Sequence, residues 1–378
     1  MKKILIILGT RPEAIKLAPI IRELQEHNDF FALSVCDTGQ HLEIKQPILD
    51  FFQIKPDYQL EALAANTNLS NLTSYLLSRI QAVIEQCQPD LILVQGDTTS
   101  AMAGALAGFY NRVQIAHIEA GLRTYNKNMP FPEEINRRII TEVADWHFAP
   151  TELARTNLIN EGIPENRIFL VGNTVVDALH FALEKIRQEE PAAVAVLKKN
   201  MFPFRQRYAK MLLLTLHRRE NLTNHLEEIG AAVQAILTKE DCFALFPVHP
   251  NPAVRHWSAA LARQLPNLLL TEPLSYETFV WAMQSCDLIL TDSGGIQEEA
   301  PSLGKPVIVL RAQTERPEAL QSGTVCQVSI DRETIEHTVS RLLNQEAEIF
   351  PTDNPFGLGN SARQIIKIIH SVFKTPYH

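Results

Sequence analysis

Short apolar runs alternate with amphipathic segments along almost the whole chain, and this alternation limits the fold more than any other feature. Several runs are apolar throughout, which is typical of parallel strands covered on both faces. Repeated strand–helix alternation predicts an α/β fold with parallel sheets and right-handed crossovers. The predicted strands are Lys3–Leu8, Ala32–Cys36, Asp90–Gln95, Val113–His117, Trp146–Ala149, Ile168–Val171, Met211–Leu216, Phe243–Val248, Leu268–Thr271, Leu288–Thr291 and Val307–Leu310.

The strands fall into two blocks. At ~150 residues per domain, the length of 378 residues corresponds to two or three domains. From about Glu184 to Arg207 the chain is polar and is broken by Pro191 and Pro203, which predicts a helix and a linker. We therefore expect a Rossmann-like domain over 1–175, a second over 176–355, and a C-terminal helix within 356–378 that could pack back on the first domain. Two such sheets facing each other would leave a cleft lined by the carboxyl ends of their strands, where ligands bind in this class of sheet.

Composition excludes several classes of protein. The 35 basic and 43 acidic residues give a net charge of -8, which argues against a general nucleic-acid binder. The apolar runs are far shorter than the ~20 residues that cross a bilayer, and the run Ile4–Leu8 stops too early for a signal peptide. The 5 cysteines form no C-x-x-C pair, so we expect neither a disulfide framework nor a structural zinc site. These features predict a cytoplasmic protein that binds neither nucleic acid nor membranes.

Several well-known catalytic motifs are absent from the sequence. It contains no G-x-x-x-x-G-K-[ST], G-x-G-x-x-G, H-E-x-x-H or G-x-S-x-G pattern. The chain is therefore a poor candidate for a P-loop NTPase, a dinucleotide-dependent oxidoreductase, a zinc protease or a serine hydrolase. The remaining candidates for chemistry lie at the turns between strands and helices.

Two turns of the first domain carry charged residues. Gly9 allows a tight exit from the first strand, and Arg11 and Lys16 could hold an anion beside the positive end of the following helix. The alternative is a helix start with surface cations. Asp97 follows the third strand, where it could be catalytic or simply cap the next helix.

Further carboxylates follow at the same predicted edge. Glu119 ends an apolar strand, where a carboxylate is costly to bury unless it has a partner or a task. Glu134 opens a later helix, and the helix dipole alone could explain it. Carboxylates that converge at one edge of a sheet can separate their pKa values and act as acid and base.

The second domain contains a histidine and an anion-binding pattern at its strand ends. His217 follows a strand and precedes Arg218 and Arg219, which favours anion binding or acid–base chemistry over a purely structural histidine. The run Ser293-Gly294-Gly295 joins a strand to a helix whose first amides could cradle an anion. Glu299 could accept hydrogen bonds from a ribose diol, and Arg316 adds a cation. Together they indicate a site for a nucleotide-sugar diphosphate, because a generic turn explains only the glycines.

These residues belong to longer motifs that resemble one family over the whole chain. The motifs are Gly9-Thr10-Arg11-Pro12-Glu13-Ala14-Ile15-Lys16, Gly96-Asp97-Thr98-Thr99, Glu119-Ala120-Gly121-Leu122-Arg123, Pro132-Glu133-Glu134, Gly172-Asn173-Thr174, His217-Arg218-Arg219-Glu220 and the run from Thr291 to Pro306. In order and register, the chain resembles the bacterial non-hydrolysing UDP-N-acetylglucosamine (UDP-GlcNAc) 2-epimerases.

The resemblance implies an architecture and an activity. It implies two Rossmann-like domains of glycosyltransferase-B type, a homodimer, and catalysis without nicotinamide, other cofactor or metal. It implies reversible epimerisation of UDP-GlcNAc to UDP-N-acetylmannosamine (UDP-ManNAc), by anti elimination of UDP to 2-acetamidoglucal and re-addition. Such an enzyme would supply precursors of cell-surface polysaccharides.

The resemblance also implies roles for particular residues. Asp97, Glu119 and Glu133 correspond to the family's essential carboxylates, and His217 to its essential histidine. The residues implied in substrate binding are Arg11 and Lys16 for the sugar and phosphate side, Phe279 for the uracil, Ser293, Gly294 and Gly295 for the diphosphate, Glu299 for the ribose, and Arg316 for the phosphates. A second, regulatory UDP-GlcNAc would bind near Gln40 and His249.

Departures from the family pattern leave the exact substrate open. Ala312-Gln313-Thr314-Glu315-Arg316-Pro317 stands where the family usually has Asp-Thr-Thr-Glu-Arg-Pro, and the loop from Tyr125 to Phe131 also differs. The alternatives are a 2-epimerase of a related UDP-acetamido sugar and a hydrolysing epimerase that releases ManNAc and UDP. A glycosyltransferase, which would need an acceptor, and a non-catalytic nucleotide-sugar sensor are two further alternatives.

Overall fold

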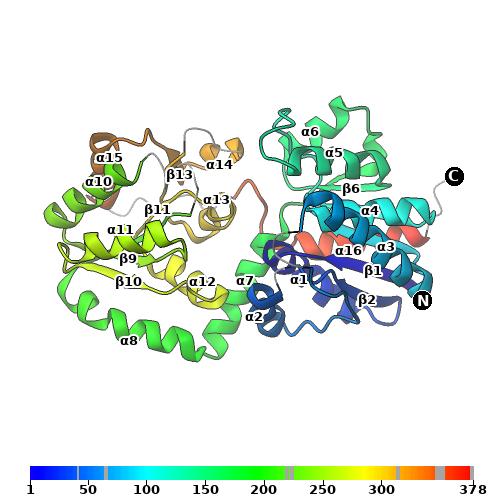
Figure 1. Cartoon of the computed structure of the whole chain (residues 1–378), viewed down its shortest axis with the longest axis horizontal. Coiled ribbons are helices and arrows are strands. Elements are labelled where there is room, and N and C mark those ends of the chain that lie inside the picture. Colours follow the sequence, from blue (N-terminus) through cyan, green and yellow to red (C-terminus); the bar gives the residue numbers. More distant parts are fainter. Residues whose placement is uncertain are drawn as a thin grey trace. The chain divides into compact units, whose positions relative to one another are not determined.

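The chain divides into two compact units, each with its own sheet and helices (Figure 1). The computed structural model describes residues 1–40, 42–63, 67–217, 221, 225–311, 316–344 and 354–374. Unit 1 comprises Met1–Ala178 and Phe356–His378, and unit 2 comprises Leu179–Pro355. The cleft expected between the two units stays a prediction.

Unit 1 is built on a parallel sheet of seven strands in the order β3-β2-β1-β4-β5-β6-β7. The direction of strand addition reverses between β1 and β4, and ligands of open α/β sheets bind outside the carboxyl ends of strands at such a point. The strands are β1 (Lys2–Leu8), β2 (Phe31–Asp37), β3 (Tyr58–Gln59), β4 (Leu91–Gln95), β5 (Gln114–Ile118), β6 (Trp146–Ala149) and β7 (Ile168–Leu170).

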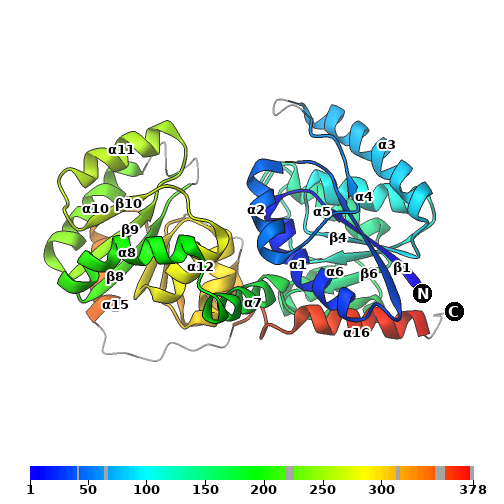
Figure 2. The same cartoon turned by 90° about the horizontal axis from the view of Figure 1, so that it is seen from below.

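Helices cover the sheet of unit 1 because its strands are apolar toward both faces. Buried residues of α3, α4 and α5 form one apolar cluster with alternate residues of β1, β4 and β5. The C-terminal helix α16 packs against α1 (Figure 2). The helices are α1 (Arg11–Glu26), α2 (Leu42–Phe52), α3 (Leu69–Cys87), α4 (Thr99–Tyr110), α5 (Glu133–Val143), α6 (Glu152–Asn160) and α16 (Ser361–Lys374), and α7 (Thr174–Gln188) begins in this unit.

Unit 2 has a parallel sheet of six strands in the order β10-β9-β8-β11-β12-β13. Numbered within the unit, this is the Rossmann order 3-2-1-4-5-6, with the reversal between β8 and β11. The strands are β8 (Lys210–Thr215), β9 (Cys242–Pro247), β10 (Leu268–Thr271), β11 (Leu288–Thr291), β12 (Val307–Val309) and β13 (Val325–Gln327). Parallel sheets with helices in both units confirm the predicted α/β class.

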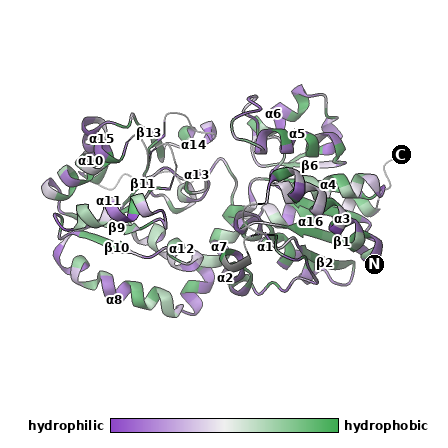
Figure 3. Ribbon diagram, viewed as in Figure 1, coloured by the Kyte–Doolittle hydropathy of each residue, from purple (hydrophilic) through white to green (hydrophobic). Residues whose placement is uncertain are grey.

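Successive side chains along the strands of unit 2 point to opposite faces of the sheet, and both faces are apolar. Leu212 and Leu214 of β8 join an apolar cluster with α10, α11 and α15, and the hydrophobic colouring runs along the strands (Figure 3). Helix α12 contacts β8 and α8. The helices are α8 (Ala192–Arg207), α10 (Leu226–Lys239), α11 (Pro252–Ala262), α12 (Tyr276–Ser285), α13 (Gly294–Glu299), α14 (Pro317–Gln321) and α15 (Arg332–Asn344).

The structure corrects the sequence prediction at three places. The edge strands β3 and β13 were not predicted, because two or three residues are too few to show a periodic pattern. The predicted break at Pro203 is wrong, since this proline lies inside α8. Helix α8 buries Val194, Leu197 and Met201, and this packing outweighs the ~3 kcal/mol that an internal proline costs.

No helix in the described part of the chain combines the length and the apolar character needed to span a membrane.

Candidate active site

The carboxyl ends of β1, β4 and β5 carry the charged residues that the sequence analysis selected in unit 1. Arg11 is the first residue of α1, and Lys16 lies just over one turn later. Asp97 follows β4, and Glu119 follows β5. Glu133 is the first residue of α5. These positions lie along one edge of the sheet and include its reversal point between β1 and β4.

Side chains from other elements hold the carboxylate of Glu119. Its Oε2 atom lies 2.5 Å from Lys16 Nζ, and it accepts hydrogen bonds from Gln95 Nε2 at 2.8 Å and Asn173 Nδ2 at 3.3 Å. The backbone of Glu119 has φ +64°, a conformation that non-glycine residues adopt rarely and that recurs at functional sites. The structure therefore gives this carboxylate a fixed position and a cation, although it is largely buried.

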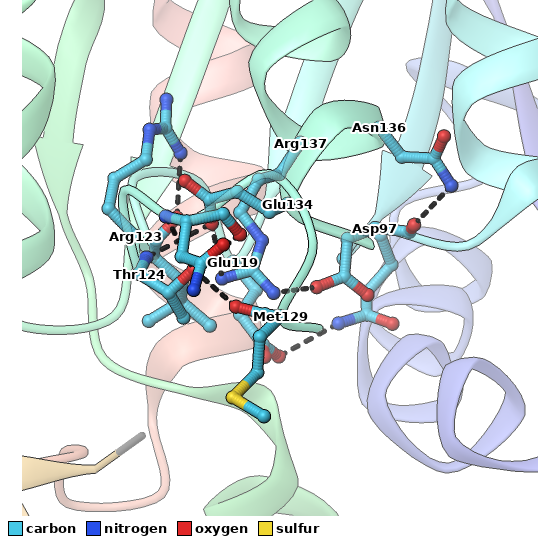
Figure 4. A network of polar contacts seen from close by, with 12 residues as sticks. Asp97, Glu119, Arg123, Thr124, Met129, Glu134, Asn136 and Arg137 are labelled. Atoms are coloured by element: carbon cyan, nitrogen blue, oxygen red, sulfur yellow. Dashed lines mark hydrogen bonds and ion pairs between the residues drawn. The ribbon is translucent and has the colours of Figure 1, made fainter. Parts of the chain in front are cut away.

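Asp97 is held through both its side chain and its backbone. Arg137 Nη2 donates to Asp97 Oδ2 at 2.7 Å, and Asn136 Nδ2 donates to the Asp97 carbonyl at 2.9 Å (Figure 4). Asp97 does not cap α4, so the alternative to a catalytic role for Asp97 is wrong. The cap of α4 is Thr98, whose hydroxyl accepts a hydrogen bond from the Ala101 amide at 3.0 Å.

The two neighbouring glutamates of α5 have different environments. Glu134 is fully buried, and its carboxylate accepts hydrogen bonds from the amides of Thr124 and Tyr125, both at 3.0 Å. It also lies 3.5 Å from Arg137, so its role is to hold the loop and Arg137, beyond any effect of the helix dipole. Glu133 has one buried carboxylate oxygen, Oε2, without a hydrogen-bond partner in the described part of the chain.

Glu13 joins the turn after β1 to the turn after β4. Its carboxylate accepts hydrogen bonds from the Thr10 amide at 2.6 Å and from the Thr98 hydroxyl at 2.9 Å. Burial raises the pKa of Glu13 from 4.5 to about 7, although these hydrogen bonds and nearby Lys45 favour the charged form. At the same turn the backbone of Gly9 comes so close to Ser100 that a Cβ at Gly9 would lie 2.4 Å from the Ser100 hydroxyl.

His217 in unit 2 forms a pair with a buried aspartate. His217 Nδ1 lies 2.9 Å from Asp292 Oδ1, and both oxygens of Asp292 accept from the His217 amide at 3.1 Å. Asn221 Nδ2 also donates to Asp292 at 3.1 Å. The carboxylate favours the tautomer with hydrogen on Nδ1 and fixes the orientation of the ring, which suits acid–base or anion-binding chemistry.

The anion-binding pattern of unit 2 starts directly after Asp292. Ser293 is the N-cap residue of α13, and its side chain makes no capping hydrogen bond. A Cβ at Gly295 would meet no atom within 4 Å. Glu299 is buried. This arrangement leaves room for a ligand beside the first amides of α13.

Arg316 and Phe279 belong to other elements of unit 2. Arg316 Nε donates to Oε1 of buried Glu298 at 2.5 Å, so this cation already has a carboxylate partner. Phe279 is half-buried in α12.

The candidate regulatory residues lie in different units. Gln40 in unit 1 accepts a hydrogen bond from the Ser100 hydroxyl at 3.0 Å. His249 in unit 2 is exposed, and partial desolvation together with the charge of nearby His217 lowers its pKa.

Some of the selected sequence lies outside the described residues, namely Arg218, Arg219 and Glu220 and the run from Ala312 to Glu315. In the described ranges, no group of three or more His, Cys, Asp or Glu side chains is placed to hold a metal ion.

Several residues that hold these charged groups were not identified from the sequence. Gln95, Arg137 and Asn173 contact the carboxylates of unit 1. Asn136 contacts the backbone carbonyl of Asp97, and Asp292 contacts His217. Asn173 stands in the motif Gly172-Asn173-Thr174, yet nothing in this motif indicates a contact with Glu119. Its position after β7, at the carboxyl edge of the sheet, was the available signal.

Comparisons with known proteins agree on one family. A family model described as UDP-N-acetylglucosamine 2-epimerase matches residues 22–370. The UDP-N-acetylglucosamine 2-epimerase of Neisseria meningitidis is 43% identical over 374 residues, covering 97% of this chain and 99% of that protein. The Escherichia coli K12 protein of the same name is 42% identical over 371 residues, covering 97% and 98%.

Solved structures show the same likeness. The crystal structure of UDP-GlcNAc 2-epimerase from Neisseria meningitidis bound to UDP-GlcNAc has a TM-score of 0.88 and 42% identity, covering 98% of this chain and 100% of that chain. The Methanocaldococcus jannaschii UDP-GlcNAc 2-epimerase in complex with UDP-GlcNAc and UDP has a TM-score of 0.79 and 36% identity, covering 98% and 99%.

Proposed function

The chain belongs to the UDP-N-acetylglucosamine 2-epimerase family, and we propose that it interconverts UDP-GlcNAc and UDP-ManNAc. The observation that carries this proposal is the set of carboxylates at the carboxyl edge of the unit 1 sheet. Asp97 and Glu119 are each paired with a cation, Arg137 and Lys16 respectively, and Glu133 lies at the start of α5. Epimerisation at C2 needs groups that remove and return a proton, and positioned carboxylates do this.

The proposed reaction has two steps, each of which is reversible. In the first step a carboxylate takes the C2 proton, the C1–oxygen bond to UDP breaks, and a double bond forms between C1 and C2 to give 2-acetamidoglucal. In the second step UDP adds back at C1 while a proton reaches C2 from the opposite face. The C2 proton is weakly acidic, so the carboxylate must be held close to it and the leaving diphosphate must be stabilised.

The remaining residues supply binding and charge stabilisation. We assign the diphosphate to Ser293, Gly294, Gly295 and Arg316, the ribose to Glu299, the uracil to Phe279, and the sugar and phosphate side to Arg11 and Lys16. His217 stabilises or protonates the leaving diphosphate, and Asp292 orients its ring. UDP-GlcNAc in the Neisseria meningitidis structure, and UDP-GlcNAc with UDP in the Methanocaldococcus jannaschii structure, support a UDP-sugar as the substrate.

The wider setting is also a proposal. We expect a cytoplasmic homodimer that needs no added cofactor or metal and supplies precursors of cell-surface polysaccharides. A regulatory UDP-GlcNAc near Gln40 and His249 predicts a sigmoidal dependence of rate on UDP-GlcNAc concentration. Alanine at either position should make that dependence hyperbolic, whereas a hyperbolic wild-type curve would argue against a regulatory site.

The test is incubation of the purified protein with UDP-GlcNAc in D2O, followed by NMR. We expect UDP-ManNAc with deuterium at C2, and the reverse reaction from UDP-ManNAc. Free ManNAc and UDP would instead identify a hydrolysing epimerase, and products without deuterium at C2 would reject the proton-abstraction route. Turnover of a related UDP-acetamido sugar in preference to UDP-GlcNAc would change the assigned substrate.

Carboxylate variants test the residue roles. Asp97→Asn, Glu119→Gln and Glu133→Gln should each lower kcat by roughly 10²–10⁴-fold, the usual contribution of a general acid or base. Glu142→Gln is the matched control, because Glu142 is an exposed residue of the same helix as Glu133. Wild-type turnover in any of the three variants would reject the role of that residue.

A further inference from the structure

We propose that His117 and Asn136 are positioning residues that hold the backbone of Asp97 and so aim its carboxylate; this inference rests on the proposed function. The two side chains come from different elements, β5 and α5. His117 is fully buried and Asn136 is 5% exposed. Neither residue has a role in the reaction as described above.

The two side chains bind consecutive carbonyl groups. His117 Nε2 lies 2.7 Å from the carbonyl oxygen of Gly96, and Asn136 Nδ2 lies 2.9 Å from the carbonyl oxygen of Asp97. These carbonyls belong to the two peptide planes that flank the Cα of Asp97. Because each peptide group is planar, holding both planes fixes φ and ψ of Asp97, and with them the direction of its Cα–Cβ bond.

The chemistry of the Gly96 carbonyl determines which atom donates in the contact with His117. A carbonyl oxygen only accepts hydrogen bonds, so His117 Nε2 must carry the hydrogen. Burial lowers the pKa of His117 to about 3, and the nearby cations Arg123 and Arg137 contribute in the same direction. The ring is therefore neutral and keeps this single donor over the whole range in which the enzyme would work.

Further contacts fix the residue before Asp97 and the Asp97 carboxylate itself. The Gly96 amide donates to the carbonyl of Ile118 at 2.9 Å, and Gly96 has φ +69°, which glycine adopts without strain. Arg137 then holds the carboxylate itself at 2.7 Å. A carboxylate that must reach a C–H bond loses much of its rate when misplaced, since a 1 Å error can cost about 10²-fold.

The experiment compares two amide substitutions at His117. The Nε2 atom of Gln follows the same path from Cβ as Nε2 of His, so His117→Gln keeps the donor to Gly96. The amide of His117→Asn instead matches Nδ1 and loses the donor. We expect His117→Asn to lower kcat by about 10–100-fold and His117→Gln to restore most of that loss. UDP affinity, assigned to unit 2, and the melting temperature of His117→Gln should stay near those of the wild type.

Asn136→Leu gives an independent test through the second carbonyl, because Leu keeps the branched shape and removes the donor. It should lower kcat by a similar factor with UDP affinity unchanged. The positioning role is overturned if folded His117→Asn or Asn136→Leu retains the wild-type kcat, or if folded His117→Gln is as slow as His117→Asn. If His117→Asn does not fold, Asn136→Leu decides. A wild-type protein without turnover of UDP-GlcNAc would reject the proposed function itself, which is a different result.

Discussion

Lys45 and Asp37 form an ion pair in which both side chains are completely buried. Lys45 Nζ also donates to the carbonyl of Gly9 at 2.6 Å, and Asp37 Oδ1 accepts from the Gly39 amide at 2.8 Å. The second oxygen of Asp37, Oδ2, is buried without a hydrogen-bond partner in the described part of the chain. The pair lies beneath the first strand-to-helix turn, so the end of β1 depends on it.

Removal of one member should destabilise unit 1 strongly. Lys45→Met leaves the buried Asp37 charge uncompensated, and breaking such a pair costs about 3–5 kcal/mol. The double variant Asp37→Asn/Lys45→Met should recover most of that loss, because no buried charge remains. Urea unfolding measures both, followed by the fluorescence of Trp146, the tryptophan of unit 1, in a background where Trp257 and Trp281 of unit 2 are replaced by Phe. A Lys45→Met protein as stable as the wild type would show that the pair contributes nothing.

Glu13 should make unit 1 less stable as the pH rises. Its pKa is about 7 in the folded protein against 4.5 for an ordinary glutamate, so the folded state keeps the proton to higher pH than the unfolded chain. Stability contributed by the protonated carboxyl is present below pH 4.5 and is lost as pH rises toward 7. The full change corresponds to roughly 3 kcal/mol.

The measurement is the free energy of unfolding at several pH values between 4.5 and 8. Glu13→Gln should remove this loss, so the difference between variant and wild type should grow in favour of the variant up to about pH 7 and then stay constant. Glu26→Gln, at the exposed end of the same helix, is the control. A constant difference across the range would show that Glu13 has an ordinary pKa.

Two buried histidines should have the opposite effect at lower pH. His117 and His147 occupy paired positions in β5 and β6, and burial lowers their pKa values from 6.5 to about 3 and about 4. The folded state excludes protons that the unfolded chain binds, so stability is lost as pH falls below 6.5. Each such group contributes about 1.4 kcal/mol per pH unit in that window.

Between pH 6.5 and about 4, unfolding of His147→Leu should therefore take up one proton fewer than unfolding of the wild type. The slope of unfolding free energy against pH, measured by urea titration, gives the number of protons directly. His27→Leu is the control, since His27 is exposed in the same unit. An unchanged slope in His147→Leu would mean that this ring is protonated in the folded state.

The longer strands could be predicted from the sequence because burial on both faces makes them apolar throughout. The predicted strand Met211–Leu216 differs by one residue at each end from β8, Lys210–Thr215. The two short edge strands could not be predicted in this way. Local sequence is also insufficient for the helix that contains Pro203. Packing of α8 against α12 keeps this helix continuous, although the local propensity of proline predicts a break.

The positions of the charged groups could be predicted, but their partners could not. Asp97 and Glu119 each follow a predicted strand, so the local sequence alone places them at the edge of the sheet. The contacts that hold them join residues far apart, 40 positions between Asp97 and Arg137 and 54 between Glu119 and Asn173. A single sequence contains no information on which distant side chain reaches which carboxylate.

The ion pair of Arg316 changes how its role in phosphate binding must be tested. Glu298, its partner at 2.5 Å, is 1% exposed. Arg316→Ala would remove the proposed phosphate contact and also leave a buried carboxylate without this cation, at a cost of about 3–5 kcal/mol. Weak UDP binding by that variant could therefore result from damage to unit 2 alone.

The double variant Arg316→Ala/Glu298→Gln separates the two effects, because it removes the cation and the buried charge together. We expect stability close to the wild type and UDP affinity, measured by calorimetry, about 10–100-fold weaker, since a hydrogen bond to a charged group contributes about 1.5–3 kcal/mol. Glu298→Gln alone should bind UDP as the wild type does. If the double variant also binds UDP as tightly as the wild type, Arg316 stabilises the fold of unit 2 and is not a phosphate ligand.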